Sequence, residues 1–291
     1  MSILIFGASG FLGRELRNYF ESKQETVLGT YFANNQPGLF HFDLKQAGLG
    51  IFGTDIKKVS FAILCSATTA MDSCKTDWEK TYKVNVEGTT ELISQLQDSG
   101  IVPVFISTDY VYDGTRGNYS EDDERVPVLA YGRQKKEVED FLFSQGGQFI
   151  IVRLGKIYSL RERDKTILTT IASDLRTGRE LRLATNQVFS PSCVRDICQA
   201  LGFLTEKRGL GCYNVCSGEP ISRFELGTLV KDRLGIKTGR LIPCSLTGFN
   251  FGDNRPLNTS MSNKRFVQAT GFRFTTLEES LEKLKQLPAT I

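Results

Sequence analysis

The sequence predicts an α/β protein with a doubly wound parallel sheet and a smaller C-terminal lobe. The chain has 291 residues, of which 40% are hydrophobic and 24% charged, so it can bury a large core without disulfides or metals. Up to about residue 155, short apolar runs alternate with amphipathic segments. Apolar runs of this kind are typical of strands buried on both faces, and their alternation with helices favours a parallel sheet. Beyond this point the pattern is less regular, which places the smaller lobe there.

The expected elements follow from periodicity and turn residues. A helix is expected to begin in the glycine-rich segment 7–13 and to run to about Glu21. Spaced apolar positions predict one long crossover helix over Cys74–Ser99, ending at Gly100 as a C-cap. A second long helix is expected over Arg223–Leu234. The expected strands are Ile3–Phe6, Thr26–Thr30, Phe40–Phe42, Phe61–Cys65, Val102–Ser107, Phe149–Arg153 and Tyr213–Cys216.

Composition disfavours several functional classes. The net charge is +3 and both signs are interspersed, so neither nucleic acid nor a membrane is an expected partner. The seven cysteines are irregularly spaced without a CxxC pair, which indicates reduced, mostly buried thiols. His41 is the single histidine, so we expect neither a metal site built on several imidazoles nor a standard histidine triad. The opening residues MSILIFG lead directly into a strand, so we expect a cytoplasmic protein.

The segment GASGFLG predicts a phosphate-binding turn. It places Gly7, Gly10 and Gly13 directly after a strand and at the start of a helix. Gly7 would allow the tight turn, Gly10 the close approach of backbone to a pyrophosphate, and Gly13 the packing of helix against strand. This context predicts a Rossmann dinucleotide-binding domain over residues 1–155, with further elements at about 188–217, and a mainly substrate-binding lobe over residues 156–291. Ser9, Phe11 and Leu12 complete the expected cofactor contacts of the turn.

The end of the second strand bears on the choice of dinucleotide. NAD-selective domains place a carboxylate there, but this chain reads LGTYFANN. Thr30, Asn34 and Asn35 could donate hydrogen bonds to a 2′-phosphate, so NADP(H) is preferred and NAD(H) remains open. Asp43, followed by Leu44, could contact the adenine or could simply cap a loop.

Tyr131 and Lys135 form a YxxxK pair on a predicted helix, and the i, i+4 spacing places both on one face. A nearby ammonium would favour the phenolate of Tyr131 and so bring this phenol into use as an acid or base. Thr108 follows the strand at Val102–Ser107 and would lie at the carboxyl edge of the sheet, where open α/β folds bind ligands.

These motifs carry a resemblance to a known family. STDYVYDG, the acidic loop SEDDERVP and YGRQK resemble the extended short-chain dehydrogenase/reductases, and most closely the dTDP-4-dehydrorhamnose reductase group. The resemblance covers almost the whole chain, including RPLNTSMSNKRF near the C-terminus. It implies that Thr108 polarises a substrate carbonyl, Tyr131 protonates the developing alkoxide, and Lys135 holds the cofactor ribose and lowers the Tyr131 pKa. It also implies cofactor-side roles for Cys65, Ser66, Ala67 and Asn85.

The substrate side departs from the family pattern. After the sixth strand the family often has a tryptophan-bearing loop such as SWVYG, whereas this chain reads GKIYSLRERDK. The segment NQVFSPSCVRD resembles a substrate-lobe loop of the family. The expected substrate contacts are Thr108, Asp109, Tyr110, Gln187, Ser190 and Arg255, with Arg255 a candidate partner of a pyrophosphate.

The resemblance implies an NAD(P)H-dependent reductase of the 4-keto group of a nucleotide-linked deoxysugar. Two alternatives stay open: a sugar-nucleotide epimerase of the same superfamily, and a non-catalytic dinucleotide-binding regulatory subunit, because the family also contains a regulator of methionine adenosyltransferase. The expected partner is a nucleotide sugar, and a homodimer is left open.

Overall fold

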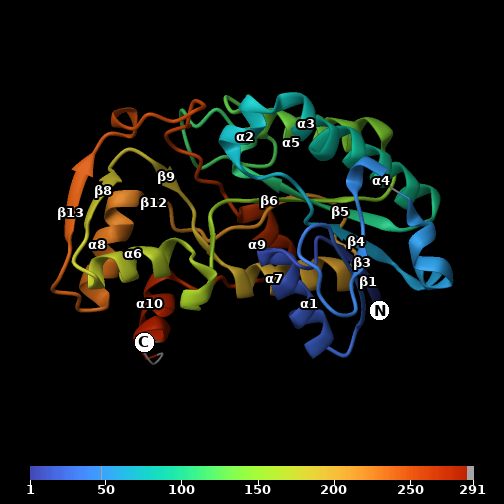
Figure 1. Ribbon diagram of the computed structural model, residues 1–291, viewed down its shortest axis with the longest axis horizontal. Helices are drawn as coiled ribbons and strands as arrows, with labels where there is room; N and C mark the ends of the chain where they lie inside the picture. Colours follow the sequence, from blue (N-terminus) through green and yellow to red (C-terminus); the bar gives the residue numbers. More distant parts are fainter. Residues whose placement is uncertain (47, 287–291) are drawn as a thin grey trace.

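A seven-stranded parallel sheet forms the centre of the protein, in the computed structural model, which describes residues 1–46 and 48–286. The strand order is β11-β6-β5-β4-β1-β2-β3, and each neighbouring pair is parallel. This order confirms the predicted doubly wound α/β fold (Figure 1). The strands are β1 (Ser2–Phe6), β2 (Thr26–Tyr31), β3 (Phe40–His41), β4 (Phe61–Leu64), β5 (Val102–Thr108), β6 (Ile150–Leu154) and β11 (Gly211–Asn214).

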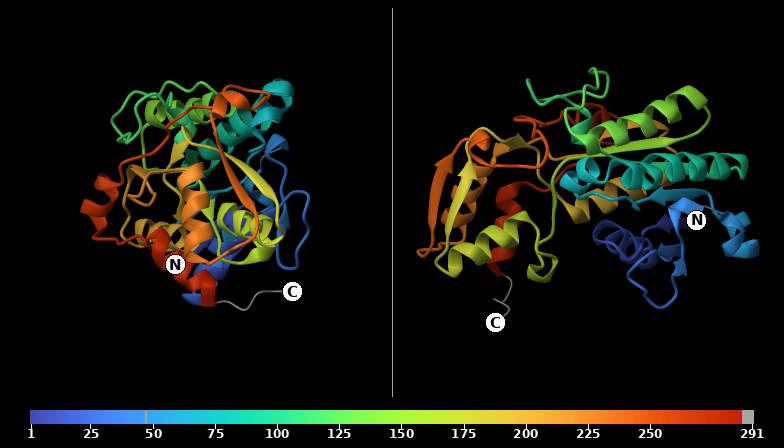
Figure 2. Two further views of the ribbon diagram at one scale, coloured as in Figure 1. Left: turned by 90° about the vertical axis from the view of Figure 1, so that its left-hand side faces the viewer. Right: turned by 45° about the horizontal axis from the view of Figure 1, so that its top comes forward.

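Two layers of helices cover the sheet. Helices α1 (Phe11–Ser22) and α7 (Val194–Glu206) pack on one face, and α4 (Gly88–Asp98) and α5 (Ala130–Gln145) pack on the other (Figures 1 and 2). Successive side chains of the central strands point to opposite faces, so each strand supplies both apolar layers. In β1, for example, Ile3 and Ile5 belong to the layer under α1, whereas Leu4 and Phe6 belong to the layer under α4. Burial on both faces explains why these strands are apolar without alternation.

The prediction of a single long helix over Cys74–Ser99 is wrong. The structure divides this region into α2 (Met71–Thr76), α3 (Trp78–Tyr82), a π-helical segment η3 (Lys83–Glu87) and α4. Asp77 has non-helical backbone angles, φ −114° and ψ 46°, which separate α2 from α3. The π-helical turn is wider than an α-helical one, and such turns are frequent at functional sites. Periodicity of apolar residues predicted the buried face and could not reveal these interruptions.

A smaller C-terminal lobe lies beside the sheet and has a core of its own. It comprises α6 (Ile167–Arg176), α8 (Arg223–Arg233), α10 (Leu277–Gln286) and the parallel pair β8 (Glu180–Ala184) and β13 (Arg240–Cys244). Figure 2 shows it at one end of the molecule. Between its parts the chain returns to the main sheet, with α7 and β11 and then with α9 (Lys264–Thr270). The division at residue 155 stays a prediction.

The remaining elements are short connections, and the expected element ends differ from the structure by a few residues. The strand expected at Tyr213–Cys216 begins two residues earlier as β11, and the expected helix over Arg223–Leu234 is α8. Short pairs join β7 (Ile157–Tyr158) to β10 (Ser192–Cys193) and β9 (Val188–Phe189) to β12 (Ile221–Ser222). The single 3-10 turns are η1 (Leu44–Gln46), η4 (Asp109–Val111), η5 (Glu162–Asp164) and η6 (Leu246–Gly248), and the longer 3-10 segment η2 (Leu49–Lys58) is kinked at Gly53.

The seven cysteines are free in the structure. Over residues 1–46 and 48–286, no three His, Cys, Asp or Glu side chains are grouped so that they could hold a metal ion. In the same described part of the chain, no helix combines the length and the apolar character needed to cross a bilayer.

Candidate active site

The glycine-rich turn joins β1 to α1 and leaves backbone exposed at the sheet edge. Gly7 has a φ of +80°, in the left-handed region that favours glycine. A Cβ atom on Gly13 would lie 2.2 Å from the carbonyl oxygen of Gly7, so only glycine allows this close packing of helix on turn. Gly10 is the N-cap of α1 and supplies no capping side chain. The first amides of α1 are therefore suited to an anionic group, as expected for a pyrophosphate.

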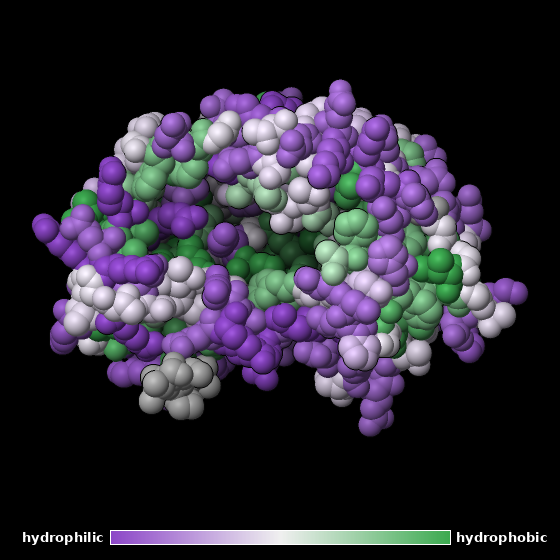
Figure 3. Space-filling view, viewed as in Figure 1, coloured by the Kyte–Doolittle hydropathy of each residue, from purple (hydrophilic) through white to green (hydrophobic). Residues whose placement is uncertain are grey.

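Two cavities meet at this turn. One, of about 670 Å³, extends from Gly7 and Ser9 toward the end of β2, and the other, of about 780 Å³, extends from Phe11 and Leu12 toward the C-terminal lobe. Both are lined by Gly10, Cys65 and Ala67. Figure 3 shows the molecule hollowed near the middle of this face, with hydrophobic residues inside and hydrophilic residues around the rim. Together the cavities form a cleft along the carboxyl ends of the strands, where an elongated ligand could lie across the sheet.

The cavity near β2 contains several of the residues expected to contact the adenosine half of a cofactor. It is lined by Asn34, Asp43, Leu44 and Ser66, and also by Lys45, which the sequence analysis did not single out. Asp43 accepts a hydrogen bond from the Lys45 amide at 3.0 Å, so its loop-capping role is present in the structure. Lys45 brings a cation to the part of the site where a 2′-phosphate was expected.

Thr30 lies beneath the turn. It is buried, and its hydroxyl oxygen accepts a hydrogen bond from the Gly7 amide at 3.0 Å. This contact ties the end of β2 to the glycine turn. A direct bond from Thr30 to a 2′-phosphate stays a prediction, whereas the bond to Gly7 gives this residue a positioning role.

Asn85 supports the cofactor side of the cleft from the π-helical segment. Its side-chain oxygen accepts from the Thr68 amide at 2.8 Å, and its nitrogen donates to the Thr68 carbonyl at 2.9 Å and to Gln134 Oε1 at 2.8 Å. Asn85 is buried, and the wider turn presents it toward the loop after β4. The side chain therefore fixes the segment that carries Ser66 and Ala67.

Thr108 and Tyr131 line the same cavity, next to the glycine turn. The Thr108 hydroxyl accepts from the Tyr110 amide at 3.2 Å and donates to Asp109 Oδ1 at 3.1 Å. Lys135 lies one turn after Tyr131 on α5, with Nζ 5.9 Å from the centre of the Tyr131 ring. The ammonium donates to the Ile106 carbonyl at 2.8 Å and lies over the Phe105 ring. The structure thus gathers the three residues expected to be catalytic.

The electrostatic environment keeps Tyr131 protonated. Burial raises the pKa of Tyr131, and the nearby Cys74, Asp109 and Tyr110 raise it further. Burial also lowers the pKa of Lys135 to about 8, although the nearby Cys65 and Glu139 oppose this shift. The expected lowering of the Tyr131 pKa by Lys135 is not among these influences. A neutral phenol is the form that can give a proton to a substrate oxygen.

Asp109 is buried behind Thr108. It accepts a hydrogen bond from the Thr259 hydroxyl at 2.6 Å in addition to the one from Thr108. Burial raises the pKa of this carboxyl to about 6, although these hydrogen bonds and Lys156 oppose the shift. The carboxylate therefore orients the Thr108 hydroxyl from behind the site.

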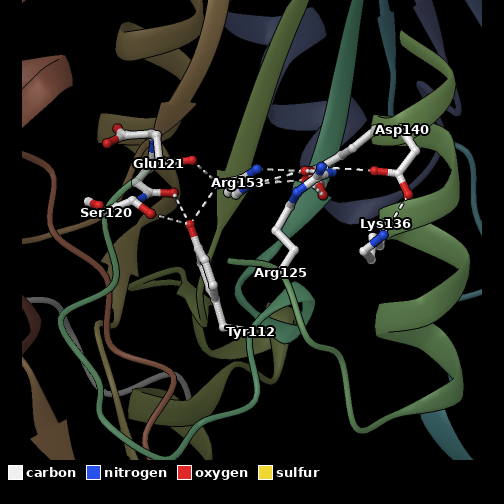
Figure 4. Close-up of polar contacts among 10 residues, drawn as sticks. Tyr112, Ser120, Glu121, Arg125, Lys136, Asp140 and Arg153 are labelled. Carbon is white, nitrogen blue, oxygen red and sulfur yellow. Dashed lines mark hydrogen bonds and ion pairs between the residues drawn. The ribbon is translucent and has the colours of Figure 1, made fainter. Parts of the chain in front are cut away.

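A buried ion pair attaches α5 to the sheet. Glu139, one turn after Lys135, accepts from Arg153 Nη2 on β6 at 2.7 Å and from the Ser107 hydroxyl on β5 at 2.5 Å. Arg153 and Glu139 have no exposed surface. Arg153 also donates to the Tyr112 hydroxyl at 2.6 Å, while Arg125 donates to Glu139 at 3.1 Å (Figure 4). These contacts hold the helix that carries Tyr131 against the strand that carries Thr108.

A further cavity of about 280 Å³ lies toward the C-terminal lobe and contains most of the expected substrate contacts. Tyr110, Gln187 and Arg255 line it. Ser190 is instead buried beneath Gly155, and its hydroxyl has no hydrogen-bond partner in the described part of the chain. Arg255 is bound to Asp72 at 2.7 Å and also contacts Met71.

Sequence reasoning missed two cations on the side of the cleft toward the C-terminal lobe. Lys156 and Arg223 line both this cavity and the one that contains Tyr131. Lys156 follows β6 directly after Gly155, so its place at a strand end could have marked it. Arg223 begins α8, where nothing in the local sequence pointed to a ligand.

The family described as "RmlD substrate binding domain" matches residues 1–287. The chain is similar to the probable low-salt glycan biosynthesis reductase Agl14 of Haloferax volcanii, with 25% identity over 98% of this chain and 97% of that protein. It is also similar to methionine adenosyltransferase 2 subunit beta of Bos taurus, with 24% identity over 96% of this chain and 86% of that protein.

Solved structures agree with the sequence comparisons. A dTDP-4-dehydrorhamnose reductase ortholog from Clostridium acetobutylicum superimposes with a TM-score of 0.86 and 27% identity, over 98% of each chain. The dTDP-4-dehydrorhamnose reductase of Bacillus anthracis, solved in complex with NADP, gives a TM-score of 0.84 at 22% identity, over 97% of this chain and 98% of that one. The predicted resemblance is confirmed by these matches, and the chain belongs to the RmlD substrate binding domain family.

Proposed function

We propose that this protein is an NAD(P)H-dependent reductase of the 4-keto group of a nucleotide-linked deoxysugar. The observation that carries the proposal is that Thr108 and Tyr131 line one cavity with the glycine turn. The position of Lys135 one helical turn from Tyr131 supports it, as do the family and its reductase relatives.

The cleft fits a nicotinamide dinucleotide. Gly7, Gly10 and Gly13 leave room for the pyrophosphate at the start of α1, and a side chain at Gly13 would collide with the turn. Lys45 and Asn34 line the cavity near β2 and would suit a 2′-phosphate, which supports a preference for NADP(H) over NAD(H). The Bacillus anthracis relative was solved with NADP, whereas other structural neighbours were solved with NAD.

A bound nicotinamide dinucleotide would supply the hydride. In this scheme the Thr108 hydroxyl turns from Asp109 to donate to the substrate carbonyl oxygen, so the carbonyl becomes more electrophilic. Tyr131 then gives its phenolic proton to the oxygen on which negative charge develops. The Lys135 ammonium, with Nζ 5.9 Å from the centre of the Tyr131 ring, would hold the cofactor ribose.

We expect Tyr131→Phe to lower kcat/KM at least about 10²-fold, because it removes the proton donor and leaves the ring in place. The measurement is oxidation of NADPH, and separately of NADH, by the purified protein with a panel of nucleotide 4-keto-6-deoxysugars. Tyr213→Phe is the matched control, since among the described residues its hydroxyl makes one hydrogen bond, to the Leu210 carbonyl at 3.3 Å. Full turnover by Tyr131→Phe would refute the proposed acid. Interconversion of sugar epimers without net oxidation of the dinucleotide would support the epimerase instead.

A second candidate function is favoured by one observation. The similarity to methionine adenosyltransferase 2 subunit beta extends over 96% of this chain, so a non-catalytic, dinucleotide-binding regulatory subunit is the alternative. Binding of NADPH without turnover of any sugar nucleotide would favour it. Homodimer formation and a cytoplasmic location stay predictions, and gel filtration of the purified protein tests the first of them.

A further inference from the structure

The two oxygens of the buried Asp109 carboxyl are held by two different threonines. Oδ1 accepts from the Thr108 hydroxyl at 3.1 Å, and Oδ2 accepts from the Thr259 hydroxyl at 2.6 Å. Thr259 lies 150 positions after Asp109 in the chain, and it is buried as well. Thr108 is thus joined, through one carboxyl, to a segment near the C-terminal end of the chain.

The segment around Thr259 is held by two other parts of the chain. The Thr259 amide donates to the Val188 carbonyl of β9 at 2.9 Å. The Asn258 amide donates, also at 2.9 Å, to the carbonyl of Gly114 in the loop that follows η4. A Cβ atom on Gly114 would collide with Pro256, so the segment lies directly against this loop. The Thr259 side chain therefore reaches Asp109 from a fixed backbone.

Asp109 depends on these hydroxyl groups, because it has no ion pair in the described part of the chain. Burial raises the pKa of its carboxyl to about 6, and the hydrogen bond from Thr259 opposes this shift more than the bond from Thr108 does. A hydrogen bond to a carboxylate stabilises its charged form. Thr259 therefore supports the charge of Asp109 more strongly than Thr108, the threonine that lines the cavity.

The proton of the Thr108 hydroxyl has two acceptors in the proposed reaction. The hydroxyl oxygen accepts from the Tyr110 amide at 3.2 Å, so the proton can go either to Asp109 or to a substrate carbonyl oxygen. A buried carboxylate that loses a donor is destabilised, and Asp109 loses one when Thr108 turns to the substrate. The bond from Thr259 stays in place at that moment and reduces this penalty.

We propose that Thr259 is a positioning residue of the reaction, which holds Asp109 and thereby frees the Thr108 hydroxyl to turn to the substrate carbonyl. The proposal rests on the proposed function, because Thr108 acts on a substrate there. Thr259 does not meet the substrate and acts through the carboxyl. Without the Thr259 hydroxyl, Thr108 is the one hydroxyl donor left to Asp109 among the described residues and stays bound to it.

Steady-state kinetics with the panel of nucleotide 4-keto-6-deoxysugars tests this role. Thr259→Val removes the hydroxyl and nearly keeps the shape of the side chain. We expect kcat to fall about 10-fold and KM to stay within about twofold of wild type, because only the step in which Thr108 turns is affected. Thr259→Ser keeps a hydroxyl and should retain kcat within about threefold of wild type.

Ser260→Ala is the matched control in the same segment. The Ser260 hydroxyl is buried, donates to Asn258 Oδ1 at 2.7 Å and accepts from the Asn118 amide at 2.9 Å. The substitution therefore removes two hydrogen bonds from this segment and leaves Asp109 untouched. We expect it to lower stability in circular dichroism melting while kcat stays within about twofold of wild type.

A double-variant comparison shows whether Thr259 acts through Asp109. In the background of Asp109→Asn the carboxylate is already absent, so the Thr259 hydroxyl has no charge to support. Adding Thr259→Val to Asp109→Asn should then change kcat by less than about twofold, whereas independent roles would give the full 10-fold loss again.

Titration of the Asp109 carboxyl tests the contact without any need for turnover. The probe is the ¹³C signal of this carboxyl in protein labelled at aspartate, assigned by its absence in Asp109→Asn. Thr259→Val removes a bond to the charged form, so we expect the titration midpoint to move to higher pH by roughly one pH unit. The titratable groups that act on Asp109 or are acted on by it are the same in both proteins: Tyr110, Tyr131, Lys156 and Cys216.

The positioning role is refuted if Thr259→Val keeps the wild-type kcat, or if the titration midpoint of Asp109 does not move. An equal loss of kcat in Ser260→Ala would show that any loosening of the segment slows the reaction, and would also overturn the role of the hydroxyl. If the wild-type protein turns over no keto sugar, the reductase proposal fails, and the titration alone decides whether Thr259 holds Asp109.

Discussion

Arg153 and Lys156 are three residues apart, yet the charge of Arg153 is paired with a carboxylate in the core, whereas the charge of Lys156 is not paired in the part of the chain that the structure describes. The Arg153 side chain lies in the core. Among the described residues its guanidinium donates to the Glu139 carboxylate, to the Tyr112 hydroxyl and to the Glu121 carbonyl. Lys156 lies beyond the end of β6, in a cavity, with no ion pair among the described residues. The neutralised charge of Arg153 therefore holds helix and sheet together, whereas the charge of Lys156 faces a cavity.

The largest effect on stability is expected from breaking the buried ion pair between Arg153 and Glu139. Glu139→Gln leaves the buried guanidinium of Arg153 without a counter-charge, so we expect the free energy of unfolding to fall by about 3–5 kcal/mol. Urea denaturation followed by circular dichroism measures this change.

The neighbouring Asp140 provides the control for that experiment. It is partly exposed and pairs with Arg125 and Lys136 at the surface of the same helix. Asp140→Asn should therefore lower stability by at most about 1 kcal/mol. Equal losses in the two variants would contradict the structural role assigned to the buried pair.

A middle-sized effect on stability is expected at Asp109, a buried carboxyl that accepts hydrogen bonds from the Thr108 and Thr259 hydroxyls but has no ion pair among the described residues. Because its pKa is raised to about 6, the folded state holds a proton that the unfolded state has lost between roughly pH 4 and pH 6. The contribution of Asp109 to the free energy of unfolding of the wild-type protein is therefore greatest at low pH, and it is lost as the pH rises through that window. Asp109→Asn has no such titration, so its stability relative to wild type should rise by on the order of 2 kcal/mol from pH 4 to pH 7. Parallel stability curves for the two proteins would rule out the raised pKa.

The smallest effect on stability is expected at Lys156. Lys156→Gln should change the free energy of unfolding by no more than about 0.5 kcal/mol, because the side chain is exposed to solvent in the cavity and holds no ion pair among the described residues. Thermal melting of the two proteins in the absence of ligand measures this. A large loss of stability would make Lys156 a structural residue like Arg153 and would remove the contrast.

The cofactor side of the molecule could be predicted from sequence, and the physical reason is local. The turn at Gly7–Gly13 requires glycine by its geometry, and the carboxyl ends of parallel strands must share one edge. Thr108 could be placed because it ends a strand, at the carboxyl edge of the sheet. Tyr131 could be paired with Lys135 because the two are one helical turn apart. The π-helical segment around Asn85 was not predictable, since apolar periodicity reports which face is buried and not how each turn is hydrogen-bonded.

The cavity toward the C-terminal lobe and the buried Arg153–Glu139 network both depend on contacts between residues far apart in the sequence. In the sequence, Glu139 is one of several charged residues on a predicted helix. Its burial follows only from the packing of α5 against β6, which brings Arg153 to it. Arg223 is 67 positions after Lys156 in the chain, and only the packing of the C-terminal lobe brings the two to a common cavity wall. Arg255 was expected to meet a pyrophosphate, but the structure adds a partner, Asp72, with which a ligand would compete.

The alternation of the chain between the sheet and the C-terminal lobe has a consequence for protein engineering. The core of that lobe combines segments at about 158–193, 221–241 and 277–284, while the intervening α7 and α9 cover the main sheet. A fragment that ended at residue 155 would leave the face under α7 uncovered and prone to aggregation. The C-terminal lobe therefore cannot be exchanged between family members as one contiguous cassette, and a graft of this lobe would have to move all three segments together.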